Sequence, residues 1–154
     1  MRKNSSHLYE NRNGKFIDIT EKAGLLNPSF GLGLCVADIN NDNWPDIYIA
    51  NDYYIPDAMY ISNGNGTFTN QIKNATKQVS FFGMGVDIGD INNDNLDDIF
   101  VLDMASQDHY RSKTLMASMN VPQFKLLNEQ LKFQTQYMFN SLQLNLDLMI
   151  RLPQ

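Results

Sequence analysis

Nine residues decide how this chain is organised. Asp38-Ile-Asn-Asn-Asp-Asn-Trp-Pro-Asp46 returns 52 residues later, almost unchanged, as Asp90-Ile-Asn-Asn-Asp-Asn-Leu-Asp-Asp98. A Phe-Gly-x-Gly sequence precedes each copy, and an apolar run with β-branched and aromatic residues follows it. Each acidic stretch therefore connects two segments that favour strands. Repetition at a fixed interval of this length is typical of repeat architectures.

A second element recurs at nearly the same interval. The segment from Tyr9 to Phe16, with Asn-Gly at its centre, resembles the segment from Tyr60 to Phe68. Asn-Gly between apolar runs indicates a tight hairpin, because both central residues of such a turn need a positive φ. Together the elements predict a unit of four antiparallel strands, at roughly 32–37, 46–50, 58–62 and 67–72. A β-propeller blade fits this unit, and a β-sandwich is the competing all-β interpretation.

The predicted fold class is all-β, a partial β-propeller of about two four-stranded antiparallel blades with a helical insertion. Residues 1–29 are expected to end a preceding blade and residues 30–80 to form a complete one. Residues 81–103 start the next blade, 104–139 form the insertion, and 140–154 resume a strand and run into an irregular tail. In the insertion, Asn120 and Pro122 are expected to start a helix. Two blades cannot close a propeller, so the sequence is interpreted as a fragment.

Composition excludes several classes of function. The chain has 154 residues, a net charge of −5 and one cysteine, so neither a disulfide framework nor a CxxC zinc site is possible. The acidic balance argues against a nucleic-acid partner, and no apolar stretch is long enough for a membrane span. Twelve of the 14 Asp lie between residues 38 and 108. The acidity therefore belongs to a segment rather than to a general solvated surface.

The start of the chain has no apolar signal-peptide core, and we expect that a signal peptide was lost with a missing N-terminus.

The acidic loops have the chemistry of a calcium site. Loop positions 1, 3, 5 and 9 are Asp, Asn, Asp and Asp, and oxygen ligands at irregular spacing suit Ca²⁺. Three carboxylates about 4 Å apart repel by roughly 4 kcal/mol per pair at an effective dielectric near 20, which a cation would relieve. The backbone carbonyl at position 7 adds a ligand. Two Ca²⁺ sites are predicted, with the ligands Asp38, Asn40, Asp42, Trp44 and Asp46, and Asp90, Asn92, Asp94, Leu96 and Asp98.

Two other interpretations of these loops fit the sequence less well. An EF-hand requires a Glu at position 12 and flanking helices, but position 12 is Ile49 or Val101 and the flanks favour strands. The second interpretation is an ordinary turn rich in Asn and Asp with no bound ion. Such a turn would not need to repeat the same four oxygen-bearing positions in both copies of the repeat. Position 6, where the turn is sharp, holds Asn43 and Asn95, and asparagine tolerates the left-handed region better than other non-glycine residues.

These motifs carry a resemblance. Phe-Gly-x-Gly, the acidic loop and the Tyr-x-Asn…Gly-x-Phe hairpin, over roughly residues 7–103, resemble the FG-GAP/VCBS repeats of integrin-α-type calcium-binding β-propellers. More narrowly, residues 103–116 and 136–145 resemble the insertion of bacterial ASPIC/UnbV-type, cartilage-acidic-protein-like propellers. The resemblance implies that the loop residues above are Ca²⁺ ligands. Asparagine at position 6 departs from the glycine usual in the family.

The resemblance also implies a function. It suggests a secreted or cell-envelope module for adhesion or recognition of an extracellular protein or glycan, with structural calcium and the remaining blades of a propeller as neighbours. No nucleophile and base pair is evident, so the chain is not expected to be an enzyme. The alternatives are non-catalytic blades of a larger secreted polysaccharide-degrading enzyme and a purely structural spacer.

Overall fold

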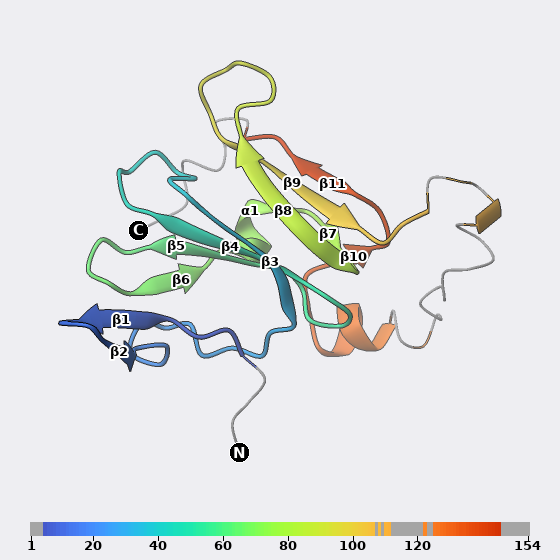
Figure 1. Cartoon of the computed structure of the whole chain (residues 1–154). Helices are drawn as coiled ribbons and strands as arrows, with labels where there is room; N and C mark the ends of the chain where they lie inside the picture. The colour runs from blue at the N-terminus through green and yellow to red at the C-terminus, as the bar shows by residue number, and fades with distance from the viewer. Residues whose placement is uncertain (1–4, 107, 109, 112–121, 123–124, 146–154) are drawn as a thin grey trace.

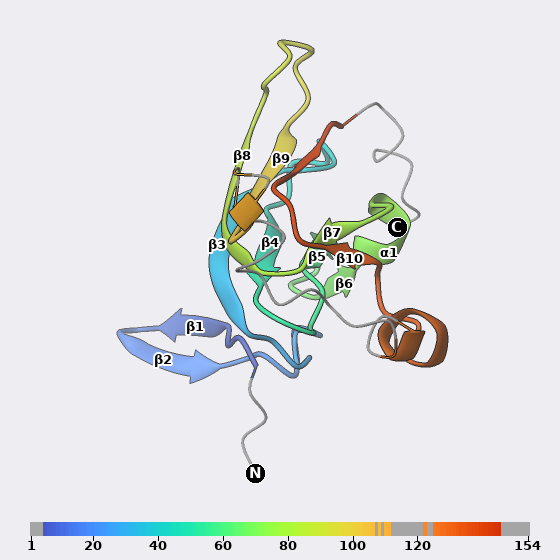
Figure 2. The same cartoon turned by 90° about the vertical axis from the view of Figure 1, so that its right-hand side faces the viewer.

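The computed structural model describes residues 5–106, 108, 110–111, 122 and 125–145. Strands dominate this part of the chain, and most of them pair antiparallel (Figure 1). The fold is all-β, with two sheets that correspond to the two copies of the repeat. A hairpin lies at the N-terminal end of the molecule, and the second acidic loop projects at the opposite end (Figures 1 and 2).

The first repeat forms a four-stranded antiparallel sheet in which each strand pairs with the next along the chain. Its strands are β3 (Gly31–Ala37), β4 (Asp46–Asn51), β5 (Ala58–Ser62) and β6 (Phe68–Asn70). These bounds lie within about two residues of the ranges that the alternation of apolar and turn residues predicts. The central strands β4 and β5 are almost wholly buried, whereas β3 has four exposed residues, Gly31, Leu32, Leu34 and Val36.

The second repeat forms a three-stranded sheet in the order β11–β9–β8. Strands β8 (Gly83–Gly89) and β9 (Asp98–Asp103) flank the second acidic loop, as β3 and β4 flank the first. The third strand, β11 (Ser141–Gln143), pairs with β9 after a connection of almost 40 residues. It occupies the place that β5 has in the first sheet.

The N-terminal hairpin consists of β1 (Tyr9–Arg12) and β2 (Lys15–Asp18). Asn13 and Gly14 connect the two strands with φ of 52° and 82°. Both values are positive, as the Asn-Gly turn requires. In the described part of the chain, β1 pairs with β2 alone.

Several elements have no counterpart in the repeat. A short helix α1 (Ile72–Ala75) follows β6, and β7 (Val79–Ser80) pairs parallel with β10 (Gln136–Tyr137). The described part of the insertion contains a π-helical turn, η1 (Leu126–Gln130). Its Leu127 packs with Phe81 and Phe82. Asn120, where a helix is predicted to begin, lies outside the described residues.

The two sheets share the largest hydrophobic core. Ile39, Tyr48 and Ala50 of the first repeat are at most 1% exposed, and Ile99 and Val101 of the second are fully buried. The backbones of β3 and β8 come close together because glycines lie at the contact. A Cβ on Gly33 would lie 2.9 Å from the Cα of Gly85. This close approach fixes the relative position of the two repeats and of their acidic loops.

Candidate metal-binding loops

The first carboxylate of each loop holds the loop's own backbone. Asp38 accepts hydrogen bonds from the backbone N–H of Asp42 at 2.9 Å and of Asn43 at 2.7 Å, one on each oxygen. Asp90 accepts the same two bonds, from Asp94 at 3.0 Å and Asn95 at 2.9 Å. Each loop therefore folds back over its first residue, and neither loop is helical.

Positions 3 and 5 form a second shared pattern. The carbonyl oxygen of Asn40 accepts the N–H of Asp42 at 3.2 Å, and its amide donates to an Asp42 oxygen at 2.9 Å. The other oxygen of Asp42 accepts the N–H of Trp44 at 2.8 Å. Asn92, Asp94 and Leu96 repeat all three contacts, at 3.1, 2.9 and 2.9 Å. The two loops thus have the same internal hydrogen-bond network.

The last carboxylate joins each loop to its sheet. Asp46 is fully buried and accepts the N–H of Ile39 at 3.0 Å and of Ser62, at the end of β5, at 2.8 Å. Asp98 is also fully buried and accepts the N–H of Ile91 at 3.1 Å and of Asn145, just after β11, at 2.8 Å. The position-9 aspartates therefore tie each loop to the third strand of its own sheet.

Left-handed asparagines shape both loops. Asn43 and Asn95, at position 6, have φ of 69° and 65°, as expected from the sequence. Asn41 and Asn93, at position 4, also have positive φ, of 56° and 62°, which the sequence analysis did not anticipate. Asparagine is enriched in this region among non-glycine residues. Two left-handed residues per loop explain how so short a connection reverses its direction and brings position 9 back to the sheet.

The electrostatics of the first loop are unfavourable for three negative charges. Burial raises the pKa of Asp46, and the neighbouring charges of Asp42 and Asp38 raise it further. The backbone N–H groups of Ser62 and Ile39 oppose this change. A cation among these side chains would relieve the repulsion, and their oxygen-only chemistry suits a hard divalent ion.

The side chains of the loops are turned towards backbone amides. No three Asp, Glu, His or Cys side chains in the described residues form a cluster that would hold a metal ion. The structure brings the predicted ligands of each loop into one hydrogen-bonded unit, but it does not bring three carboxylates to one point. Ion binding would require the carboxylates to exchange some amide contacts for the metal, or to use their remaining lone pairs.

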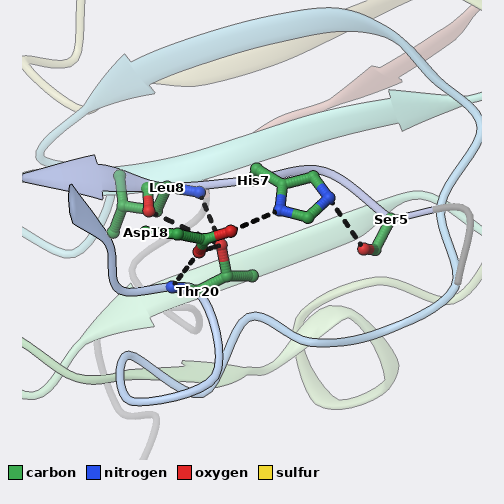
Figure 3. Close-up of polar contacts among 5 residues, drawn as sticks. All are labelled: Ser5, His7, Leu8, Asp18 and Thr20. Atoms are coloured by element: carbon green, nitrogen blue, oxygen red, sulfur yellow. Dashed lines mark hydrogen bonds and ion pairs between the residues drawn. The ribbon is translucent and has the colours of Figure 1, made fainter. Parts of the chain in front are cut away.

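A separate polar network lies in the N-terminal hairpin (Figure 3). His7 Nδ1 lies 3.0 Å from an Asp18 oxygen, and Ser5 Oγ lies 3.5 Å from His7 Nε2. Thr20 donates its hydroxyl and its N–H to Asp18, and these bonds, more than His7, lower the pKa of Asp18 to about 2. The order Ser-His-Asp resembles a hydrolytic triad. Both His7 and Asp18 are exposed, however, so we assign the network to holding the hairpin ends together.

One buried acid was not found from the sequence. Asp57 is 1% exposed and accepts the hydroxyl of Tyr48 and the N–H of Asn51, each at 2.9 Å. Burial is the main cause that raises its pKa to about 7, and the charge of Asp103 adds to the effect. The residue 52 positions later is a histidine, so the repeat comparison gave no signal here.

Comparison with known proteins identifies the class of this fold. The family model described as FG-GAP-like repeat matches residues 2–49 and 38–101, which together cover well over half of the chain. The chain belongs to the FG-GAP-like repeat family.

Two human proteins are similar to this chain. Integrin alpha-6 is 38% identical over 87 residues, and integrin alpha-7 is 30% identical over 86 residues. Each match covers 49% of this chain, but only 8% and 7% of the respective integrin. The similarity therefore concerns a small part of each relative. Within the described residues, no helix has both the length and the hydropathy needed to cross a membrane.

Proposed function

We propose that this chain is a calcium-binding repeat module that recognises a protein or glycan ligand outside the cytoplasm. The observation that carries the proposal is the duplicated loop. Two segments 52 residues apart have the same Asp, Asn, Asp and Asp positions and the same hydrogen-bond network. Ordinary connecting turns do not require such agreement, whereas a shared ligand does.

The proposed ligands are those predicted from the sequence. In the first loop they are the side chains of Asp38, Asn40, Asp42 and Asp46 and the backbone carbonyl of Trp44. In the second loop they are the side chains of Asp90, Asn92, Asp94 and Asp98 and the carbonyl of Leu96. Calcium supplies charge neutralisation and rigidity here, not catalysis. At 100 times its dissociation constant, each ion would stabilise the fold by about 2.7 kcal/mol.

The recognition role rests on family membership and on the similarity to integrin alpha chains. A propeller would need further blades beside these two sheets, so we propose that FG-GAP-like repeats flank them. The boundaries between the blades, the insertion and the tail, after residues 29, 80, 103 and 139, are part of this proposal. The narrower relationship to ASPIC/UnbV-type propellers is part of it too. The second acidic loop projects from its sheet at the end of the molecule opposite the N-terminal hairpin, which is consistent with a rim that faces a ligand (Figure 1).

Calorimetric titration with Ca²⁺ tests the metal sites. The chain, stripped with a chelator, should bind two ions, and Asp38→Ala and Asp90→Ala should each remove one. Asp87→Ala is the matched control, because Asp87 is an exposed acid on β8 outside both loops. The double variant should bind none and should lose the rise in melting temperature that Ca²⁺ gives the parent.

The result that would refute the metal sites is equally clear. Absence of Ca²⁺ uptake by the parent would do so, as would unchanged stoichiometry in both loop variants. A screen against matrix proteins and glycans, with and without Ca²⁺, tests recognition separately, and failure to bind any of them with both ions in place would argue for the spacer role.

A further inference from the structure

Four aromatic rings form a cluster at the end of the two sheets that lies away from the acidic loops. Tyr53 and Tyr54 lie in the link that follows β4, and Phe81 and Phe82 lie just before β8. The first acidic loop precedes β4 and the second follows β8, so the cluster and the acidic loops lie at opposite ends of these strands (Figure 1). The ring centroids are 4.6–6.0 Å apart in the contacting pairs. Both repeats therefore contribute to one aromatic cluster.

The two tyrosines of this cluster are exposed, and the two phenylalanines that support them are buried. Tyr53 and Tyr54 are 51% and 43% exposed, whereas Phe81 and Phe82 are 4% and 9% exposed. Tyr53 contacts Phe82 edge to face at an interplanar angle of 82°, and Tyr54 contacts Phe81 at 86°. The second repeat supplies the supporting rings and is part of this chain. The tyrosines are therefore exposed with the adjoining repeat already in place.

The backbone of Tyr53 has a conformation that bulky residues rarely adopt. Its φ is 59°, and every other non-glycine residue with positive φ in the described part of the chain is an asparagine, except Lys132. The carbonyl oxygen of Tyr53 accepts the side-chain amide of Gln136 at 3.0 Å. Gln136 is 3% exposed and comes from β10, 83 residues later in the sequence. A long-range contact thus holds an exposed ring in a strained conformation, and such strain is concentrated at sites that bind ligands.

Asp52 adds a carboxylate beside the exposed pair. Its backbone N–H is donated to the carbonyl oxygen of Phe30 at 3.1 Å, next to the start of β3. One carboxylate oxygen of Asp52 accepts the N–H of Tyr53 at 2.9 Å, and no contact among the described residues engages the other oxygen. A ligand on the two tyrosines would therefore meet aromatic faces and, beside them, an anionic acceptor for hydroxyl groups.

We propose that Asp52, Tyr53 and Tyr54 form a binding site for a neutral saccharide chain. The C–H groups on one face of a pyranose ring carry a partial positive charge and stack on the electron-rich face of an aromatic ring. The sugar hydroxyls would donate to the second oxygen of Asp52. This carboxylate and the net charge of −5 disfavour sulfated or uronic-acid chains. The inference rests on the recognition role proposed above: it names a ligand class and a site, and it places that site away from the projecting loop.

A peptide is a poorer occupant of this surface. Extended peptides bind along a strand edge, and helical peptides bind in an apolar groove. Residues 52–57, which carry the exposed tyrosines, belong to no strand or helix of the described chain, so they offer no edge for strand addition. Ring faces with one adjacent carboxylate suit a ligand that has C–H groups on its faces and hydroxyl groups around its rim.

An immobilised array of neutral hexose oligosaccharides, with sulfated and uronic-acid oligosaccharides on the same surface, is the probe for the full chain in Ca²⁺. The parent should bind neutral members and no anionic ones. Tyr53→Asn and Tyr54→Ala should each weaken binding to the best neutral member by about tenfold or more. Asparagine tolerates positive φ, so Tyr53→Asn should melt close to the parent. Tyr53→Phe keeps the ring and should bind within about threefold of the parent.

Two further variants separate this site from the rest of the molecule. Tyr9→Ala is the matched control, because Tyr9 is 52% exposed on the N-terminal hairpin, and it should leave binding unchanged. Asp52→Asn keeps an acceptor for the Tyr53 N–H but loses the charge, so it should weaken binding by a smaller factor than removal of a ring. Calorimetric titration of every variant should still give two Ca²⁺ ions.

The outcomes distinguish this inference from the proposed function. Saccharide binding that survives both Tyr53→Asn and Tyr54→Ala would overturn the inference and leave the recognition role intact. Binding of matrix proteins but of no saccharide, lost in Tyr53→Asn, would also overturn it, because the surface would then serve a protein. A parent that takes up two Ca²⁺ ions but binds neither class would overturn the recognition role as well and leave the calcium sites standing.

Discussion

Replacing the buried Asp57 with asparagine should change how stability depends on pH. Its carboxyl accepts hydrogen bonds from Tyr48 and Asn51 and faces the charge of Asp103, and it is 1% exposed. Asparagine has nearly the same shape and keeps an acceptor for the Asn51 amide. It cannot ionise. The substitution therefore removes the charge with little change in packing.

The size of the effect follows from the pKa of Asp57, which rises from 3.8 to about 7 on folding. Folding favours the protonated acid, so the group's contribution to stability is complete below pH 3.8 and is lost as the pH rises through 7. The difference between these two pKa values corresponds to about 4 kcal/mol in the free energy of unfolding. The Tyr48 hydroxyl loses its acceptor in the variant, which costs about 1 kcal/mol at every pH.

The two opposing effects predict that the stability curves cross. At pH 4, Asp57→Asn should be about 1 kcal/mol less stable than the parent, and at pH 8 about 3 kcal/mol more stable. Urea unfolding at half-unit steps from pH 4 to 8, followed by circular dichroism, measures the difference. Subtracting the two curves removes every contribution to stability that the two proteins share.

Asp87→Asn is the control, because Asp87 is an exposed acid on β8. Its curve should run parallel to that of the parent. Parallel curves for Asp57→Asn and the parent across the whole range would refute the reasoning, since the carboxyl would then titrate alike in the folded and unfolded chain.

Two further predictions concern the backbone. Gly33→Ala should destabilise the fold by about 1–3 kcal/mol, because its Cβ would lie 2.9 Å from backbone atoms of Gly85 and Val86. A Cβ on Gly89 would meet nothing within 4 Å, so Gly89→Ala should be nearly neutral in the same urea titration. Equal losses would contradict the close approach of the strands. Asn43→Ala should cost about 1 kcal/mol because φ there is 69°, while Asn43→Gly should stay within about 0.5 kcal/mol of the parent. Thermal unfolding of both variants in excess Ca²⁺ measures this, and a stable alanine variant would show that the turn can relax.

Much of the strand arrangement could be predicted because the sequence repeats itself. Apolar runs next to Gly and Asn-Gly locate β1 to β6, β8 and β9, and the positive φ of Asn13, Asn43 and Asn95 follows from the demands of tight turns. The twin hydrogen-bond networks follow from the same spacing. Local chemistry determines these features, so a single sequence is enough to predict them.

Other features depend on contacts between distant segments. The parallel pairing of β7 with β10 and the π-helical turn lie in sequence that has no repeat counterpart. Leu34 and Val36 alternate along β3 in the manner of residues that face a core, yet the fold leaves them 66% and 56% exposed. Likewise, Asp57 is unremarkable in sequence, and its raised pKa arises from burial that the whole sheet creates.

Asn145 connects the two acidic loops. Its backbone N–H is donated to Asp98, while its side-chain amide donates to the carbonyl oxygen of Ile39 at 3.1 Å, and the N–H of Ile39 is held by Asp46. Through Asn145 and Ile39, the anchoring carboxylate of each loop is therefore joined to that of the other by a short chain of hydrogen bonds. If both loops take calcium as we propose, Asn145 links the two sites through its hydrogen bonds to Asp98 and Ile39.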